Sequence, residues 1–314
     1  MAIDIATRAG TGGVRRTRRA VRLTPRDRVA IAVMAGVPVL VVGGLIWFPT
    51  LASIALSFTN WDGIGGITRA HWVGTENYHQ IATIYPPFWP AVKHNLIWLG
   101  FLTIVATPFG LLLAYQLDKK IRGTRVYQTI FFLPVVLSLA IIGFIWELIY
   151  SPDEGLINNV FSNPAHGHVI DWLGNPKLNL WAILVAVSWR HAGYIMILYL
   201  AGLKALDPSL REAAAIDGAG EWHAFRTVVF PALRPINIVI VVVTVIEALR
   251  AFDIVYIINR GRNGLELLSV LVTNNIIGEA SRIGYGSAIA VILIVISIVP
   301  IVVFVWNSFQ ERQA

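Results

Sequence analysis

Residues 207–235, DPSLREAAAIDGAGEWHAFRTVVFPALRP, form one polar stretch in an otherwise apolar chain. Asp207 is a good helix N-cap, and Pro208 suits the first helical position, where its missing N–H costs nothing. Glu212 to Ala215 are strong helix formers, three of them alanines, and Asp217-Gly218 offers a left-handed stop. The stretch therefore predicts a short exposed helix of about 15 Å, a sharp turn and a second amphipathic segment.

The part of this stretch after the turn carries apolar residues at helical spacing, namely Trp222, Phe225 and Val229. Such a face is suited to a membrane surface or to a position beneath other helices. Pro231 and Pro235 follow, and we expect them to end the segment because proline interrupts a helix.

Composition identifies the surroundings in which this stretch lies. The chain has 314 residues, of which 56% are hydrophobic and 14% charged, and its mean hydropathy is +0.67. These values are far from those of a soluble domain and indicate an integral membrane protein. The sequence contains no cysteine, which excludes disulfides, thiolate metal sites and a cysteine nucleophile.

Six apolar stretches are long enough to cross a bilayer, which takes about 20 residues. They are residues 29–48, 95–117, 129–149, 180–203, 235–258 and 286–306. The sequence therefore predicts an all-α polytopic membrane protein with six transmembrane helices.

Arginine and lysine residues predict the orientation, because positively charged loops stay on the cytoplasmic side. Basic residues precede the first span and separate the second from the third. They are Arg15, Arg16, Arg18, Arg19, Arg22, Arg26 and Arg28, then Lys119, Lys120, Arg122 and Arg125. The stretch between the fourth and fifth spans is basic too, so we expect it and both termini to be cytoplasmic. The loop with Arg260, Arg262 and Arg282 fits this rule poorly.

Residues 1–28 are predicted to be an Arg-rich cytoplasmic tail before an uncleaved anchor helix. The following apolar run is too long for the hydrophobic region of a signal peptide and lacks an obvious small-residue cleavage site. Topology accounts for nearly all of the net charge of +7, so we expect no nucleic-acid partner. Attraction to anionic lipid is an alternative role for the tail.

Catalytic signatures are not found. The sequence has no G-x-x-x-x-G-K-[ST] phosphate loop, so ATP-driven work requires another subunit. His166 and His168 stand in a loop rich in Asn, Pro and Gly, where a solvated pair is expected rather than a zinc site, which needs more ligands. We expect no enzyme activity, no metal and no cofactor bound by this chain.

The apolar stretch 235–258 contains three charged residues, Glu247, Arg250 and Asp253. Each costs about 2.5–3.5 kcal/mol at the centre of a bilayer, which nearly cancels the gain of about 0.3–0.6 kcal/mol from each large apolar residue. The charged face must therefore look into the helix bundle, a cavity or a partner. The spacing of three permits ion pairs of Arg250 with both carboxylates along one side of a helix, and lining a solute pathway is the alternative role of Arg250.

Candidate substrate-pathway residues come from two predicted spans. The carboxylate of Glu247 is able to accept hydrogen bonds from the hydroxyl groups of a polyol. The fourth span offers Trp189, Arg190 and His191 near mid-membrane, where helix packing is the alternative role of the tryptophan. The candidates are Trp189, Glu247, Phe252 and Asp253.

The polar stretch resembles the cytoplasmic signature of the permease subunits of binding-protein-dependent ABC importers, in the carbohydrate-uptake branch that includes maltose-type and glycerol-3-phosphate-type systems. That signature reads E-A-A, three residues, G, nine residues, then I-x-L-P. The matching residues are Glu212, Ala213, Ala214 and Gly218, then Val228-Val229-Phe230-Pro231, with conservative departures at Val228 and Phe230.

The resemblance covers roughly residues 30–310. It includes Phe48-Pro49, Ser57-Phe58-Thr59, Gly74-Thr75-Glu76-Asn77-Tyr78, Phe132-Leu133-Pro134, Trp189, Leu200-Ala201-Gly202-Leu203, Phe252-Asp253 and Gly284-Tyr285-Gly286-Ser287-Ala288. One departure is the loop 259–264, Asn-Arg-Gly-Arg-Asn-Gly, where many relatives have Thr-x-Gly-Gly-Pro.

The resemblance implies a mechanical role for the short helix at about residues 208–217, which docks in a groove of an ATPase subunit. It implies a type I ABC importer permease fold, with residues 29–94 as the first transmembrane helix and external loop. Residues 95–309 are then a core permease domain of five transmembrane helices, and 205–235 are the coupling segment within it. The implied coupling residues are Glu212, Ala213, Ala214, Asp217, Gly218 and Ala219.

The partners implied by the resemblance are a second homologous permease, two ATPase subunits that bind ATP and Mg²⁺, and an extracytoplasmic solute-binding protein. The expected location is the cell membrane of a prokaryote, with the chain as a multi-pass protein in contact with lipid. The alternative is a self-sufficient secondary carrier that uses Glu247, Asp253 and Arg190 as a proton or ion relay, for which inverted repeats and broken helices are typical.

Overall fold

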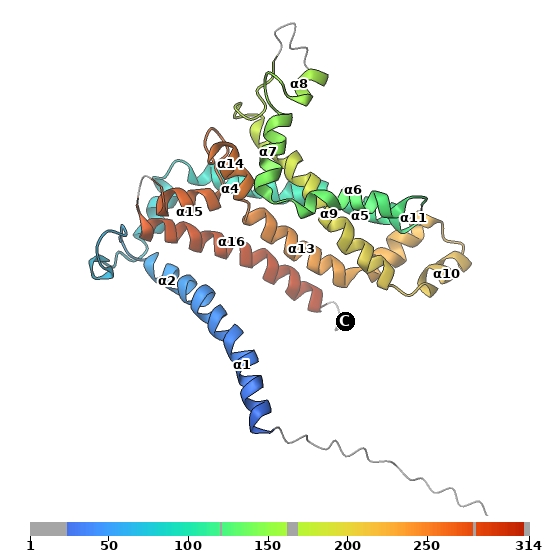
Figure 1. Cartoon of the computed structure of the whole chain (residues 1–314), viewed down its shortest axis with the longest axis horizontal. Coiled ribbons are helices and arrows are strands. Elements are labelled where there is room, and N and C mark those ends of the chain that lie inside the picture. Colours follow the sequence, from blue (N-terminus) through green and yellow to red (C-terminus); the bar gives the residue numbers. More distant parts are fainter. Residues whose placement is uncertain (1–23, 120, 162–168, 279–280, 311–314) are drawn as a thin grey trace, which may run out of the picture. The chain divides into compact units, whose positions relative to one another are not determined.

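The computed structural model describes residues 24–119, 121–161, 169–278 and 281–310, and it is mainly helical (Figure 1). Within these ranges the one strand-like pairing is an antiparallel bridge between Thr59 and Trp72. The described part of the chain is therefore all-α, as predicted. Most of the Arg-rich tail, Lys120 and the His166–His168 pair lie outside the described residues. The chain divides into two compact units, residues 1–51 and 52–314.

The described part of the first unit is one long helix. Thr24 and Asp27 form a capping box at the start of α1 (Pro25–Val42), and η1 (Gly43–Trp47) leads into α2 (Phe48–Leu56), which continues into the second unit. Together they make an apolar helix of 32 residues. No residue of its most apolar 18-residue stretch is buried inside this chain. A helix that is apolar all round suits the interior of a membrane, in agreement with the predicted span 29–48.

Three further predicted spans are long apolar helices of the second unit. The first joins α4 (Phe88–Phe101), η3 (Leu102–Ala106) and α5 (Thr107–Asp118). The other two are α9 (Asn179–Ala205) and α16 (Ile283–Gln310). With the first helix, four helices of the described residues are long and apolar enough to cross a membrane.

The third predicted span, 129–149, is not one straight helix. The chain forms α6 (Thr124–Val136) and α7 (Leu139–Ile149), which meet at 102°. Pro134 lies in the last turn of α6, and Ser138 then adopts an extended conformation and caps α7 through a hydrogen bond from the Ile141 N–H. If this bent pair counts as one span, the described residues hold five candidate spans by length and composition.

The fifth predicted span, 235–258, is also broken. It consists of α13 (Arg234–Leu249) and α14 (Asp253–Asn259), with Arg250 following the first helix. Because the helix ends before Arg250, the predicted row of Glu247, Arg250 and Asp253 along one helical side is wrong. The predicted count of six spans is therefore not confirmed, because residues 129–149 and 235–258 are each divided into two helices.

Shorter helices complete the described chain. They are η2 (Ile67–Arg69), α3 (Glu76–Thr83), α8 (Leu156–Phe161), α10 (Ser209–Ile216), α11 (Glu221–Ala224), η5 (Phe225–Val229), α12 (Phe230–Ala232) and α15 (Leu268–Ile276). The sequence did not predict α15, which lies in the loop between the fifth and sixth expected spans.

Proline explains the three wide helical turns. The segments η1, η3 and η5 are π-helical, and each is followed two residues later by a proline: Pro49, Pro108 and Pro231. A proline within a helix removes one hydrogen bond, and its ring clashes with the carbonyl four residues earlier. A wide turn just before the ring relieves that clash, so the helices continue past their prolines.

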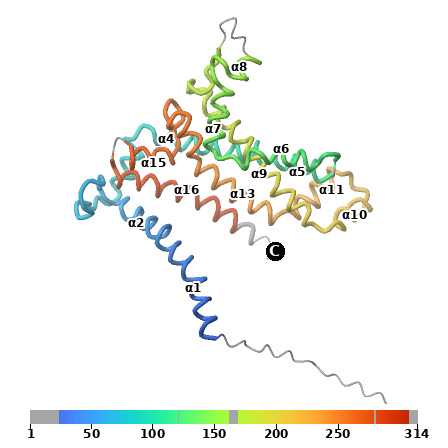
Figure 2. Tube along the Cα trace, viewed as in Figure 1, coloured from blue at the N-terminus to red at the C-terminus, as the bar shows by residue number. Residues whose placement is uncertain are grey.

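Within the second unit, α9 is the central element. It packs against α5 and α6, while α13 packs against α16 and α14 against α7 (Figure 2). More than half of the most apolar part of α9 is buried. The α5–α9 contact is close at Gly110, where an added Cβ would lie 2.8 Å from the Ala192 carbonyl oxygen.

Candidate functional site

The polar stretch folds into the predicted short helix. α10 (Ser209–Ile216) begins one residue after Pro208, the predicted first helical position. The Asp207 carboxylate accepts a 2.9 Å hydrogen bond from the Ser209 N–H. This backbone hydrogen bond lowers the pKa of Asp207, so the carboxylate that starts the helix stays charged at neutral pH.

The predicted left-handed stop is confirmed at Gly218, whose φ is +78°. The Ala219 N–H donates to the Ala214 carbonyl at 3.0 Å, and the Gly218 N–H donates to the Ala215 carbonyl at 3.1 Å. This pair of bonds is the Schellman arrangement that closes a helix. The left-handed conformation of Gly218 and these two hydrogen bonds therefore define how the chain leaves α10.

Most predicted coupling residues lie on the surface. Glu212, Ala213, Asp217 and Gly218 are exposed, Ala219 is half-buried and Ala214 is buried at 6% exposure. Their neighbour Ile216 is 86% exposed. The helix thus presents a carboxylate, small side chains and one large apolar side chain to its surroundings, while Ala214 packs it onto the rest of the chain.

The segment after the turn differs in part from its prediction. Phe225 and Val229 are buried, while Trp222 is 69% exposed and stacks on the Phe225 ring with centroids 5.8 Å apart. Pro231 does not end the segment, because α12 continues to Ala232. The chain turns at Leu233, and Pro235 stands in the first turn of α13.

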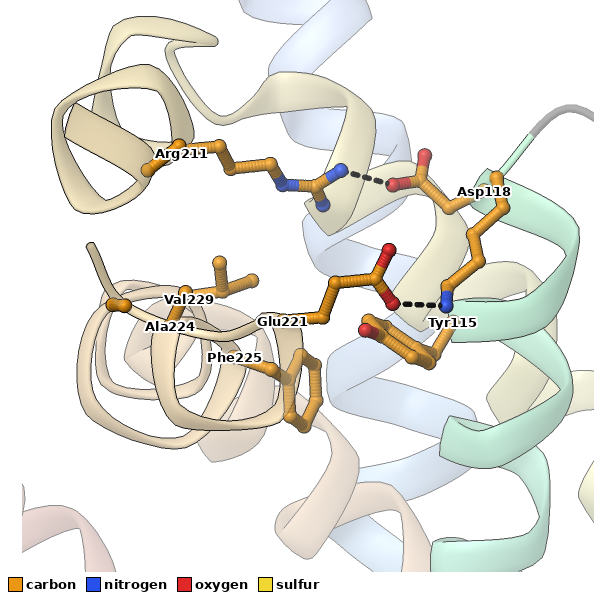
Figure 3. Close-up of a pocket in the computed structure, with 10 residues that line it drawn as sticks. Tyr115, Asp118, Arg211, Glu221, Ala224, Phe225 and Val229 are labelled. Carbon is orange, nitrogen blue, oxygen red and sulfur yellow. Dashed lines mark hydrogen bonds and ion pairs between the residues drawn. The ribbon is translucent and has the colours of Figure 1, made fainter.

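Two ion pairs connect the polar stretch 207–235 to the end of α5 (Figure 3). An Arg211 Nη atom lies 2.6 Å from an Asp118 carboxylate oxygen, and Lys119 Nζ lies 2.6 Å from a Glu221 carboxylate oxygen. They border a cavity of about 210 Å³. The other lining residues are Tyr115, Ala215, Ala219, Ala224, Phe225 and Val229.

Both ends of the Lys119–Glu221 pair stay charged at neutral pH. The hydrogen bond to Glu221 raises the pKa of Lys119, and the same bond lowers the pKa of Glu221. Because the carboxyl pKa falls on folding, the attraction is complete above the ordinary glutamate pKa of 4.5 and is lost as the pH falls below it. Because the ammonium pKa rises, the attraction is complete below 10.5 and is lost at higher pH.

A second polar site lies at the break between α13 and α14. Arg190 of α9 pairs with Glu247 of α13 at 3.5 Å, in place of the predicted pairing with Arg250. The Arg190 Nε atom is buried and has no hydrogen-bond partner among the described residues. A cavity of about 240 Å³ lies here, lined by Leu139, Arg190, Ile246, Glu247, Arg250, Ala251 and Asp253.

The structure brings together some, but not all, of the predicted pathway residues. Glu247 and Asp253 share the cavity with Arg190, and Phe252 lines an adjacent cavity of about 470 Å³ together with Asp253. Trp189 lines neither cavity, and its ring packs edge-on against Trp146 with centroids 6.1 Å apart.

Backbone groups at the break and at the start of α15 find side-chain partners on neighbouring helices. The Asn95 amide donates to the Ala248 carbonyl at 3.3 Å and accepts from the Leu268 N–H at 3.0 Å. The Ser269 hydroxyl donates to the Ala251 carbonyl. Irregular backbone at membrane depth persists only where it is satisfied in this way or lines a cavity, and here both conditions hold.

His191 stands next to this site without lining it. Its Nε2 lies 3.5 Å from the Thr107 hydroxyl and 3.3 Å from the Thr244 hydroxyl, and the ring is buried. These contacts connect α9 to α5 and α13, so the histidine joins three helices.

Comparison with known protein families gives a match over most of the chain. Residues 106–313 match the model of the family described as binding-protein-dependent transport system inner membrane component. The match contains the polar stretch, both broken spans and the cavity at the second break.

Curated relatives resemble nearly the whole chain. A protein of Pyrococcus horikoshii named "Probable ABC transporter permease protein" is 31% identical over 88% of this chain and 95% of its own. A xylose/arabinose import permease of Haloferax volcanii is 30% identical over 91% and 90% of the two chains. A trehalose/maltose transport system permease of Thermococcus litoralis is 31% identical over 73% and 77%.

Solved structures share the fold. A chain of a bacterial ABC transporter that imports the acidic polysaccharide alginate superposes with a TM-score of 0.77, at 20% identity, over 91% of this chain and 96% of that one. A chain of a bacterial alginate transporter in complex with a pentasaccharide-bound periplasmic protein gives a TM-score of 0.74 over 89% and 93%.

Proposed function

Because this chain belongs to the binding-protein-dependent transport system inner membrane component family, we propose that it is the membrane-spanning subunit of an ATP-driven sugar importer, coupled to a separate ATPase through α10. The exposed helix and glycine turn at the residues of the family signature are the observation that carries this proposal. The sugar class comes from relatives whose names give xylose, arabinose, trehalose and maltose as their solutes.

The surface of α10 suits docking into a groove of another protein. Glu212 is exposed and offers a carboxylate to a partner arginine, a charge-assisted contact. Ala213 permits close approach, and an isoleucine that is 86% exposed gains by being covered. Asp217 and Gly218 form the turn that ends the helix. In this proposal ATP and Mg²⁺ bind the ATPase subunits and this chain catalyses nothing.

The polar site at the α13–α14 break is suited to a hydroxylated solute. Arg190 and Arg250 offer donors, while Glu247 and Asp253 offer acceptors, so the formal charges balance. A neutral sugar carries many hydroxyl groups that both donate and accept. Phe252, stacked on Tyr256 with centroids 4.9 Å apart, adds an apolar surface beside the site. Trp189 is a pathway candidate because it is next to Arg190, which lines the cavity.

The assembly proposed for this function contains a second homologous permease, two ATPase subunits and an extracytoplasmic solute-binding protein in the cell membrane of a prokaryote. The solved alginate transporter in complex with its periplasmic protein supports partners of this kind. A self-sufficient secondary carrier is the alternative that the intramembrane charges suggested. Membership in an ABC permease family favours the importer.

The test uses the chain purified with its native partners and reconstituted in liposomes with its binding protein. Uptake of ¹⁴C-labelled xylose, arabinose, maltose and trehalose is measured with and without ATP. We expect ATP-dependent uptake of at least one sugar, and Glu212→Ala to reduce it at least about five-fold. The control Lys204→Ala, an exposed residue in the last turn of α9, should retain uptake.

Two results contradict the proposal. Uptake without ATP that is unaffected by Glu212→Ala would instead support a secondary carrier. ATP-dependent uptake that Glu212→Ala leaves unchanged would separate α10 from the ATPase contact.

A further inference from the structure

Two adjacent residues at the end of α5 hold opposite sides of the Gly218 turn. Asp118 pairs with Arg211 on α10, before the turn (Figure 3). Lys119 pairs with Glu221 on α11, after the turn, and the N–O distance is 2.6 Å in both pairs. The signs are crossed, negative to positive and positive to negative. We call these four residues the charge clamp.

An apolar layer lies behind the charge clamp. The Tyr115 ring lies 4.7 Å from Lys119 Nζ and 4.7 Å, between centroids, from the Phe225 ring. Phe225 and Val229 are buried against the same part of α5. The end of α5 therefore holds both arms of the turn through charge and through packing, and the turn cannot move without α5 unless these contacts break.

α5 is in turn connected to the helices that line the polar cavity. At Gly110 the α5 backbone approaches α9 so closely that no Cβ fits, and His191 bridges threonines of α5 and α13. α9 and α13 carry Arg190 and Glu247 of the cavity. A continuous set of contacts thus runs from α10 through α5 to the cavity.

We propose that the charge clamp conveys displacement of α10 to α5, and through α5 to the cavity. Asp118, Lys119, Arg211 and Glu221 are then positioning residues for transport. Exposed ion pairs contribute little to stability, and three of these four side chains are well exposed. Their crossed arrangement instead fixes the direction of the turn relative to α5. This inference rests on the proposed function, because it requires an ATPase that moves α10.

Charge reversal tests the clamp in the reconstituted complex with its ATPase, sister permease and binding protein. The variants are Asp118→Arg, Arg211→Asp and the double reversal, and the matched control is Arg125→Asp, an exposed charge at the start of α6. The two quantities measured are ATP hydrolysis and uptake of the ¹⁴C-labelled sugar that the wild type transports.

We expect each single reversal to assemble normally and to hydrolyse ATP, with sugar imported per ATP lowered at least about five-fold. The double reversal should restore the ratio, since the pair is re-formed with exchanged signs, and Arg125→Asp should match wild type. Unchanged ratios in the single reversals, or loss of assembly in the single and double reversals alike, would overturn the clamp. A wild-type complex without ATP-dependent uptake would instead overturn the proposed function itself.

Discussion

At the residue scale, Gly218 has a backbone conformation that favours glycine, and it forms the turn after the helix that we propose contacts the ATPase. Its φ of +78° lies in the region that glycine adopts freely, and an added Cβ would meet no atom within 4 Å. A substitution there is therefore strained by the backbone alone and not by crowding. This makes the residue a clean probe of the turn direction.

We expect Gly218→Val to strain the turn by about 1–2 kcal/mol and to reduce ATP-dependent uptake while the complex still assembles. Gly218→Asn is the matched variant, because asparagine tolerates the left-handed conformation, and it should retain most uptake. The measurement is sugar uptake alongside recovery of the ATPase subunits. Equal loss in both variants would show that side-chain space, not conformation, matters at this position.

At the element scale, the helices themselves followed from the sequence, but their continuity did not. Four of the six predicted spans are long apolar helices, because sustained hydropathy is a strong signal. The two broken spans are just as apolar over most of their length. Pro134 was an available signal for the first break. For the second, the signal was three charges within seven residues, which we interpreted as one charged helical face.

The ion pairs between helices could not be predicted from the sequence, because the paired residues are far apart in the chain. Asp118 and Arg211 are 93 residues apart, and Lys119 and Glu221 are 102 apart. From the sequence, Lys119 was only one of the basic residues that predict the orientation of the chain, and no role was predicted for Asp118. No periodicity or motif joins residues at such separations, whereas α10 and its glycine stop are local and were predicted within one residue.

The α5–α9 contact gives a prediction at this scale. Gly110→Ala places a Cβ 2.8 Å from the Ala192 carbonyl oxygen and 2.9 Å from Ile195 Cβ, and we expect a loss of about 1–3 kcal/mol in stability. Gly100→Ala in α4 is the control, since its Cβ would meet nothing within 4 Å, and alanine favours a helix by up to about 1 kcal/mol.

The measurement is the thermal unfolding midpoint of the detergent-purified complex. A lowered midpoint for Gly110→Ala with an unchanged or raised midpoint for Gly100→Ala is the expected result. Equal midpoints would mean that α5 and α9 separate easily, which would weaken the path from α10 to the cavity.

At the scale of the whole molecule, the central claim is that this chain transports only as part of a larger assembly. It contains no phosphate-binding loop, it belongs to a permease family, and it exposes an isoleucine and a carboxylate on a short helix that closes at a glycine turn. Each of these observations is explained if an ATPase subunit covers α10.

The most direct measurement is purification of the tagged chain from its native membrane in mild detergent, followed by mass spectrometry of the proteins that accompany it. We predict an ATPase and a second polytopic permease in comparable amount, and we predict that Glu212→Ala reduces the recovered ATPase. Recovery of this chain alone, with sugar transport in liposomes that needs no ATP, would contradict the account.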